Sequence, residues 1–266
     1  MKSVSIIAIT SPQGGCGKST IATNLALYFA KRSIRTMLID FAGYGSFAPL
    51  LNLPTKSKGM SSLLLEMDSY EIQSKDGQPD LRDETWEGKR IFRESLLQHP
   101  THRSLSILFS ASALKMDRML YEQARLIMEL AKSEQPQIVM IDLPSDLHVR
   151  QVAALEMADQ IIVPTFADII SGWKLMQFKE FVEFGGIDQH KISLVVNRMH
   201  RKSDFDSKEF SNEYSWQVLA EIPDFSERML SFINQGIAIE DSNDRKIFAS
   251  FRELGDQLLK KAGVIK

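Results

Sequence analysis

The chain has 266 residues, of which 44% are hydrophobic and 25% are charged, and its formal net charge is -2. This composition is typical of a globular protein and excludes a disordered chain. The net charge also excludes a protein whose whole surface is basic and binds DNA through that charge. No apolar run reaches the roughly 18 residues that a membrane helix needs, and the N-terminal residues lack the pattern of a secretory signal. We therefore expect one cytoplasmic domain, spanning residues 1–266, without a transmembrane segment.

The first thirty residues predict a strand, a glycine-rich loop and a helix. An apolar run from Val4 to Ile9 precedes the loop at residues 10–20, and apolar residues at helical spacing follow from Ile21 to Ala30. A loop of this kind turns its backbone N–H groups and the helix N-terminus toward phosphate oxygens. The order strand, loop, helix is the context in which such a phosphate-binding motif works.

The side chains of the loop favour a nucleoside triphosphate. Lys18 would contact the β- and γ-phosphates, the Ser19 hydroxyl would bind Mg²⁺, and Thr20 would hydrogen-bond the α-phosphate. The alternative, a glycine-rich turn that only joins a strand to a helix, does not explain the Lys-Ser-Thr triplet. The candidate nucleotide-binding residues here are Gln13, Gly14, Gly15, Cys16, Gly17, Lys18, Ser19 and Thr20.

Two later apolar strands each end in a carboxylate. Residues 35–40 end at Asp40 and residues 137–142 end at Asp142. The carboxyl ends of strands are where an α/β sheet places its ligand-binding residues. In a protein with a phosphate loop, Asp142 would orient Mg²⁺ or its bound water, whereas the alternative is a carboxylate that caps the next helix.

The middle of the chain is less regular. A helix is expected to begin at residues 59–65, and the polar residues from about Glu66 to Lys89 are interpreted as an exposed insertion, either a variable loop or a partner-binding one. We then expect a short helix over residues 91–97, a strand over 105–109 and a helix over 116–131.

The second half alternates helices and strands, which predicts an α/β fold with a mostly parallel sheet and helices on both faces. The expected helices are 149–157, 169–184, 226–234 and 245–262, and the expected strands are 160–164, 191–197 and 216–222. The last helix has one apolar side, which would dock on the sheet or, alternatively, lie on a membrane.

These motifs resemble those of the ParA/MinD family of P-loop ATPases. The loop is similar to the family's K-G-G-x-G-K-[ST]-T, although Pro12 stands where the common phosphate loop has its first glycine. The matching blocks are residues 14–20, 38–40, 138–142, 195–198, 221–224 and 233–238. The resemblance implies ATP and Mg²⁺ as cofactors and a homodimer that forms across bound nucleotide.

The resemblance also implies roles for individual residues. Lys18 and Asp40 would act in catalysis, Asp40 and Asp142 would lie near Mg²⁺ and the attacking water, and Ser19 and Asp142 would bind the metal. Asn197 would recognise the adenine, with the backbone around Pro223 contributing. The alternative for Asn197 is a polar residue in a turn at the end of a strand.

Two departures from the family pattern predict slow hydrolysis. The family's signature lysine reaches across the dimer to the partner's phosphates, but this chain has Gln13 there, and Ala42 replaces a second carboxylate associated with the attacking water. Loss of a positioned cation can cost on the order of a thousandfold in phosphoryl-transfer rate. Candidates to compensate are Arg35, Lys56 and Lys58.

Three functions remain open at this stage. The first is an ATP-gated factor that positions a cellular structure or assembly through an unidentified protein partner. The second is an active partition ATPase with nonspecific DNA binding, for which the basic residues at 198–202 and Lys208 are the main support. The third is an ATP-dependent maturation or metabolic enzyme, which the lone Cys16 and the scattered histidines favour least because they offer no metal-ligand spacing.

Overall fold

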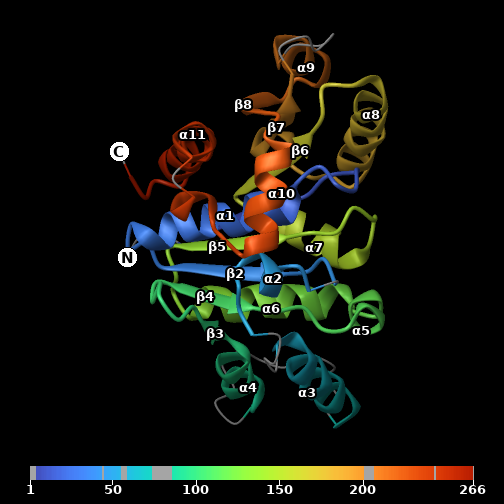
Figure 1. Ribbon diagram of the computed structural model, residues 1–266. Coiled ribbons are helices and arrows are strands. Elements are labelled where there is room, and N and C mark those ends of the chain that lie inside the picture. The colour runs from blue at the N-terminus through green and yellow to red at the C-terminus, as the bar shows by residue number, and fades with distance from the viewer. Residues whose placement is uncertain are drawn as a thin grey trace.

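In the part of the chain that the structure describes, the centre of the molecule is an eight-stranded sheet (Figure 1). The computed structural model describes residues 4–43, 45–54, 59–73, 86–200, 207–242 and 244–265. The strand order is β3-β4-β2-β5-β1-β6-β7-β8, and every neighbouring pair is parallel except β3 with β4. The expected α/β fold with a mostly parallel sheet is therefore confirmed.

The strands alternate with helices along most of the chain. The strands are β1 (Ser5–Ile9), β2 (Thr36–Asp40), β3 (Leu97–Gln98), β4 (Leu105–Leu108), β5 (Ile138–Asp142), β6 (Gln160–Thr165), β7 (Ile192–Met199) and β8 (Gln217–Pro223). The α-helices are α1 (Lys18–Lys31), α2 (Phe47–Leu50), α3 (Gly59–Gln73), α4 (Gly88–Ser95), α5 (Ala113–Asp117), α6 (Tyr121–Ser133), α7 (Val149–Met157), α8 (Ile169–Phe184), α9 (Ser207–Tyr214), α10 (Ser226–Gln235) and α11 (Arg245–Lys261).

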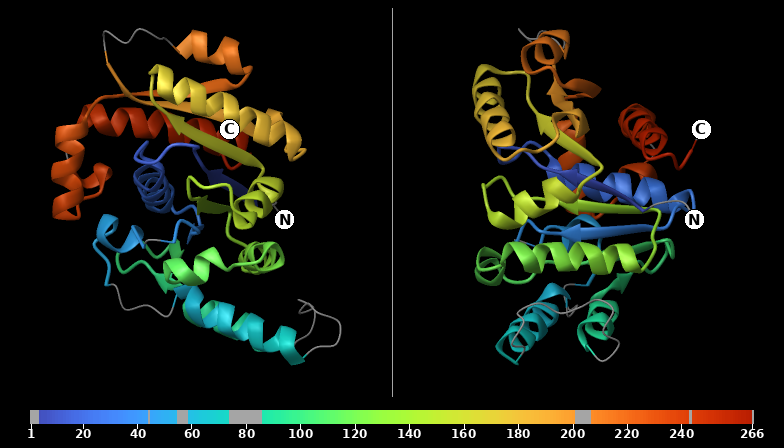
Figure 2. Two further views of the ribbon diagram at one scale, coloured as in Figure 1. Left: turned by 90° about the vertical axis from the view of Figure 1, so that its right-hand side faces the viewer. Right: turned by 180° about the vertical axis from the view of Figure 1, so that it is seen from behind.

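Helices cover both faces of the sheet, and each face has its own hydrophobic core (Figure 2). On one face, residues such as Ala8 and Val139 pack with the buried sides of α6, α7 and α8. On the other face, Ile7 and Met140 pack with α1 and α11. Because the central strands are buried on both sides, they consist of continuous apolar runs, which is why the sequence revealed them.

The region from Met116 to Ala131 was wrongly expected to be one helix. The structure has α5 and α6 instead, separated at Leu120, whose backbone is extended with φ -80° and ψ 158°. The side-chain oxygen of Gln123 accepts a hydrogen bond from the Leu120 N–H at 3.0 Å, so α6 begins with its own cap. Neither proline nor glycine marks this break in the sequence.

The expected exposed insertion is wrong at its two ends. Helix α3 continues through this region as far as Gln73, and Met67 is buried in the core, as is Trp86 just before α4. Residues 74–85 lie outside the described part of the chain, where the insertion stays a prediction. That the whole chain forms one domain also stays a prediction.

The last helix docks on the protein. Ile247, Phe251, Leu254 and Leu258 of α11 are buried, and the helix packs against β8 and α1. Within the described residues, none of the helices combines the length and the apolar character needed to cross a membrane.

Candidate nucleotide site

The phosphate loop joins the end of β1 to the start of α1, as the sequence predicted. Gly17 is the N-cap residue of α1 and has φ 98°, a left-handed conformation that side chains strongly disfavour. A Cβ atom at Gly17 would lie 2.6 Å from Nδ2 of Asn197, so the space is closed as well. The loop thus needs glycine here for two separate reasons.

Lys18 points to the end of the neighbouring strand β5. Its Nζ donates a hydrogen bond to the Ser145 hydroxyl at 2.5 Å and lies 3.4 Å from the backbone oxygen of Gln13. Both contacts are to groups that a phosphate oxygen can replace. Lys18 is therefore held at the loop with its charge available for an anion.

Ser19 and Asp142 meet beside Lys18, as expected for a metal site. The Ser19 hydroxyl donates to Oδ2 of Asp142 at 2.5 Å. Asp142 is fully buried, and its Oδ1 has no hydrogen-bond partner among the described residues. The pKa of Asp142 is raised to about 7, mainly by burial and also by the nearby charge of Asp40, while the Ser19 hydrogen bond and the charge of Lys18 work in the opposite direction. An orphaned carboxylate oxygen beside a serine hydroxyl fits an octahedral Mg²⁺ with its water ligands.

Asp40 makes its contacts with the turn that follows β2 and with Ser110. It is fully buried at the end of β2, and its oxygens accept hydrogen bonds from the Ala42 N–H at 2.9 Å and the Ser110 hydroxyl at 3.2 Å. Burial raises its pKa to about 6, and these two hydrogen bonds work in the opposite direction. Asp40 thus shapes the turn at Ala42 and Gly43, which line the cavity in its place.

The phosphate loop opens onto a cavity of about 780 Å³. Its walls come from the loop, from the turn after β2, from α5 and from the segment after β5. The lining residues are Gly14, Gly15, Lys18, Ser19, Ala42, Gly43, Ser46, Ala113, Leu114, Met116, Asp117, Pro144, Ser145, Asp146 and Arg150. Sequence reasoning missed Ser145, Asp146 and Arg150, although their position directly after the aspartate of β5 was an available signal.

Arg150 holds three walls of this cavity together. Its guanidinium donates to the backbone oxygens of Phe41 at 3.1 Å and Met116 at 3.0 Å, and to Oδ2 of Asp146 at 3.3 Å. The side chain is almost fully buried, and this desolvation lowers the pKa of Arg150. Arg150 is therefore a brace between the turn after β2, helix α5 and the start of α7.

A second cavity, of about 140 Å³, lies on the other side of the loop. Gly17, Thr20, Asn197 and Pro223 line it, so the structure brings these predicted residues together. Asn197 donates from Nδ2 to the backbone oxygen of Cys16 at 2.8 Å, and its Oδ1 accepts from the Arg198 N–H at 2.9 Å. Arg198 and Ser226 also line the cavity, and the rest of the wall is apolar: Ile21, Ile222, Phe225, Met229, Leu230, Ile233 and Phe251. A narrow, largely apolar slot with one amide suits a flat heteroaromatic base.

Gln13 and Cys16 of the phosphate loop both contact other groups of this chain. The Gln13 side chain accepts a hydrogen bond through Oε1 from the Ser171 hydroxyl of α8 at 2.6 Å. Cys16 is buried, with its Sγ 3.2 Å from the backbone oxygen of Gln13, which agrees with a small filler residue.

The compensating cations and the basic cluster are only partly described. Arg35 donates to the backbone oxygen of Gln135 at 3.1 Å. It precedes β2 and so lies at the opposite end of the parallel strands from the phosphate loop, and its role as a compensating cation stays a prediction. Lys56 and Lys58 lie outside the described residues. Arg198 stacks over the Phe166 ring at 5.2 Å, and Lys208 is exposed on α9, whereas residues 201–202 are not described.

A phosphate loop between β1 and α1, with Lys18, Ser19 and Asp142 converging on it, defines a P-loop nucleoside-triphosphatase fold. A family model described as an AAA domain (AAA_31) matches residues 4–186. The chain belongs to this family, and it is similar to P-loop ATPases of the ParA/MinD type.

Similar proteins in other organisms carry MinD names. The septum site-determining protein MinD of Thermotoga maritima is 24% identical over 260 residues, which cover 95% of this chain and 87% of that protein. The putative septum site-determining protein MinD of Chlorella vulgaris is 27% identical over 199 residues, covering 73% of this chain and 61% of that protein. This chain thus spans about three fifths of the length of the first curated relatives that it matches.

Solved structures share the fold over nearly the whole chain. MinD of Pyrococcus horikoshii, in complex with Mg-ADP, has a TM-score of 0.75 at 18% identity and covers 98% of both chains. A ParA family ATPase of Chlorobium tepidum has a TM-score of 0.77 at 17% identity, covering 96% of this chain and 99% of that one. At these identities the likeness establishes the fold alone.

Proposed function

We propose that the protein is a cytoplasmic ATP-binding switch that requires Mg²⁺. The observation that carries the proposal is the contact of Ser19 with Asp142, whose second carboxylate oxygen is buried without a partner among the described residues. Lys18 and the loop glycines would hold the phosphates, and Ser19 and Asp142 would hold the metal. When bound, Mg²⁺ would neutralise charge on the phosphates. The Mg-ADP complex of the P. horikoshii protein supports this assignment.

The second part of the proposal is that ATP turns over slowly. Gln13 occupies the loop position that the family fills with its signature lysine, and its side chain is engaged by Ser171 of the same chain. It therefore supplies no cation to a second subunit. Ala42 lines the phosphate cavity without a carboxylate to orient water. Both features remove groups that act on the transition state, while the groups that bind the ground state are kept.

The third part concerns the biological output. We propose that ATP stabilises a homodimer and that the dimer acts, through a protein partner, in positioning or partition of a cellular structure. Neighbours of this fold with such names support this level of description, among them a MinC:MinD cell division complex of Aquifex aeolicus and a putative plasmid partition protein of Borrelia burgdorferi.

The test combines ATP turnover with oligomeric state. We would measure phosphate release and light scattering for the wild type, Lys18→Ala and the matched surface control Lys246→Ala, with and without Mg-ATP. We expect dimers on Mg-ATP with negligible turnover in the wild type and the control. In Lys18→Ala, ATP affinity should fall about 10- to 100-fold, because a charge-assisted contact is lost. Rapid turnover, especially if stimulated by DNA, would replace this proposal with an active partition ATPase.

A further inference from the structure

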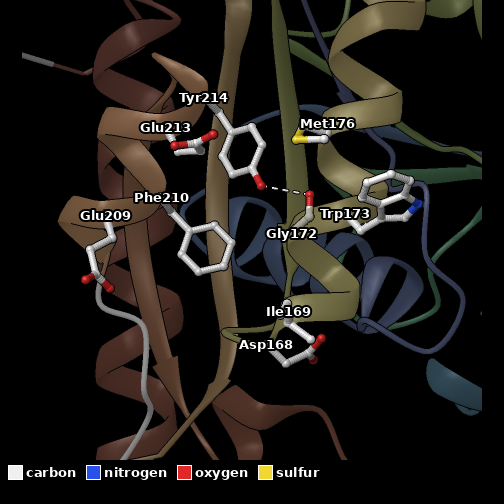
Figure 3. Close-up of a pocket in the computed structure, with 9 residues that line it drawn as sticks. All are labelled: Asp168, Ile169, Gly172, Trp173, Met176, Glu209, Phe210, Glu213 and Tyr214. Carbon is white, nitrogen blue, oxygen red and sulfur yellow. Dashed lines mark hydrogen bonds between the residues drawn. The ribbon is translucent and has the colours of Figure 1, made fainter.

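An apolar groove of about 420 Å³ lies between α8 and α9 (Figure 3). Its lining residues differ from those of the two nucleotide cavities. On α8 it is lined by Ile169, Trp173 and Met176, which recur at helical spacing and are 75%, 61% and 40% exposed. From α9, Phe210 and Tyr214 form the opposite wall. Large apolar side chains gathered in one concave site mark a place where another molecule binds.

The two walls of the groove are joined by a hydrogen bond. The Tyr214 hydroxyl donates to the backbone oxygen of Gly172 at 2.7 Å, which Figure 3 shows as the dashed line. A Cβ atom at position 172 would lie 3.2 Å from the Tyr214 hydroxyl, so glycine lets α9 approach this closely. The groove is thus a built feature with fixed walls.

The charge of the lining selects the occupant. Among the described residues that line it, the charged side chains are acidic, namely Asp168, Glu209 and Glu213. Carboxylates around an apolar floor repel anionic lipid surfaces and nucleic-acid phosphates, and they attract lysine and arginine. The groove therefore fits an amphipathic helical segment with an apolar face and basic flanks.

The groove is also connected to the phosphate loop through the first turn of α8. Asp168 caps the helix by accepting a hydrogen bond from the Ser171 N–H at 2.8 Å, and Asp168 and Gly172 line the groove on either side of Ser171. The hydroxyl of this buried Ser171 donates to Gln13 at 2.6 Å. One helical turn thus contacts the phosphate loop and shapes one end of the groove.

We propose that the α8–α9 groove is a docking site for an apolar, basic segment of a protein partner, and that the Gln13–Ser171 hydrogen bond links its affinity to nucleotide occupancy. The link, but not the docking site, rests on the proposed ATP switch. Nucleotide that reshapes the loop around Gln13 would shift the first turn of α8, and by reciprocity a bound partner segment would change the affinity for nucleotide.

The docking site is tested with a fluorescein-labelled helical peptide of Leu and Lys. A Leu and Glu peptide is its charge control. We expect the Leu/Lys peptide to bind full-length protein, measured by anisotropy, and to shift the emission of Trp173, the exposed tryptophan. Glu213→Lys and Trp173→Ala should each weaken binding about tenfold or more, while Glu253→Lys on α11 should not. Equal weakening by Glu253→Lys, or no binding, would overturn the site. Tighter binding of the Leu/Glu peptide would overturn the proposal that the partner segment is basic. Self-association that Trp173→Ala abolishes would overturn it too, because the occupant would then be a second copy of this chain.

The nucleotide link is tested by repeating the titration with and without Mg-ATP in the wild type and in Ser171→Ala. The wild type should show a severalfold change in peptide affinity that Ser171→Ala loses. Binding of a fluorescent ATP analogue is measured in the same samples. If the analogue binds and peptide affinity does not respond, the link is wrong and the switch stands, whereas no analogue binding means that the proposed function itself fails.

Discussion

Asp40 and Asp142 lie beside each other in register, at the carboxyl ends of the adjacent parallel strands β2 and β5. Both carboxyl groups are fully buried, and burial raises the pKa of each, to about 6 for Asp40 and about 7 for Asp142. When both are ionised, the site holds two neighbouring negative charges, and the charge of Lys18 acts on Asp142. The site is thus deficient in positive charge at neutral pH, which a divalent cation would supply.

The first prediction concerns stability against pH. In the unfolded chain both carboxyls have a pKa near 4, so between about pH 4 and pH 7 the folded state binds more protons than the unfolded state. The contribution of these groups to the free energy of unfolding therefore falls as pH rises through that window. Thermal melts of the nucleotide-free protein without metal should show a lower melting temperature at about pH 8 than at about pH 5.

Asp142→Asn should flatten this pH dependence and raise the melting temperature at about pH 8 by a few degrees, because a buried charge is removed. Mg-ATP should stabilise the wild type and have much less effect on Asp142→Asn. Glu253→Gln, an exposed carboxylate on α11, is the control and should melt like the wild type. An unchanged slope in Asp142→Asn would show that this carboxyl is ionised in the folded protein across the whole range.

A second prediction separates two glycines of the phosphate loop. Gly17→Ala should destabilise the protein by about 1–3 kcal/mol and weaken nucleotide binding, because φ 98° is strained for alanine and its Cβ would meet Asn197. Gly14→Ala should change stability by less than about 1 kcal/mol, since nothing lies within 4 Å of a Cβ there. Urea denaturation of both variants measures the free energy of unfolding. An equal loss of stability in both would show that the backbone conformation at Gly17 does not require glycine.

A third prediction tests the brace at Arg150. Arg150→Met should cost about 3–5 kcal/mol, because it leaves the Phe41 and Met116 carbonyls without their donor in a buried site. Arg150→Lys keeps the charge but has only one donor group to share between separate carbonyls, so it should recover little of the loss. Arg245→Met, at an exposed position on α11, serves as the matched control. Chemical denaturation measures the free energy of unfolding of each variant. If Arg150→Met were as stable as the wild type, the structural role assigned to Arg150 would be wrong.

A fourth prediction addresses hydrolysis at position 13. Gln13→Lys should raise steady-state phosphate release by roughly 10- to 1000-fold, because it adds a cation near the transferred phosphate, and adding Ala42→Asp should increase the rate further. Gln13→Ala is the control that also breaks the contact with Ser171 but adds no charge, and it should stay slow. A wild type already as fast as Gln13→Lys would remove the basis of the slow-turnover proposal.

Sequence reasoning was strongest where local signals and burial agree. Helix α8 has the predicted bounds, because Asp168 caps its start and apolar residues recur along it. The break at Leu120 was missed, since it arises from a cap formed by Gln123 and from packing on each side. β3 was missed because two residues are too few to give a periodicity.

The candidate nucleotide site likewise contains residues that the sequence indicated and contacts that it did not. That Lys18, Ser19 and Asp142 come together could be predicted, because Lys18 and Ser19 follow β1 after the phosphate loop and Asp142 ends β5. Their roles toward nucleotide and metal stay predictions. The contact between Gln13 and Ser171 joins positions 158 residues apart, and no property of either residue in isolation indicates it. Asp40 was predicted as a catalytic group, and its hydrogen bonds to Ala42 and Ser110 place it behind the cavity wall, which only the folded turn reveals. Its catalytic role stays a prediction.

The edges of the sheet limit how copies of this protein can join. At one side the sheet ends in β3, which is two residues long and pairs with β4 in the antiparallel direction. At the other side β8 ends at Pro223, which has no N–H to donate, and α9 and α11 pack against this strand. A two-residue edge strand and a proline at the end of the other edge strand both disfavour the addition of a further strand. The homodimer proposed above would therefore form through loops and helices, where bound nucleotide could control it.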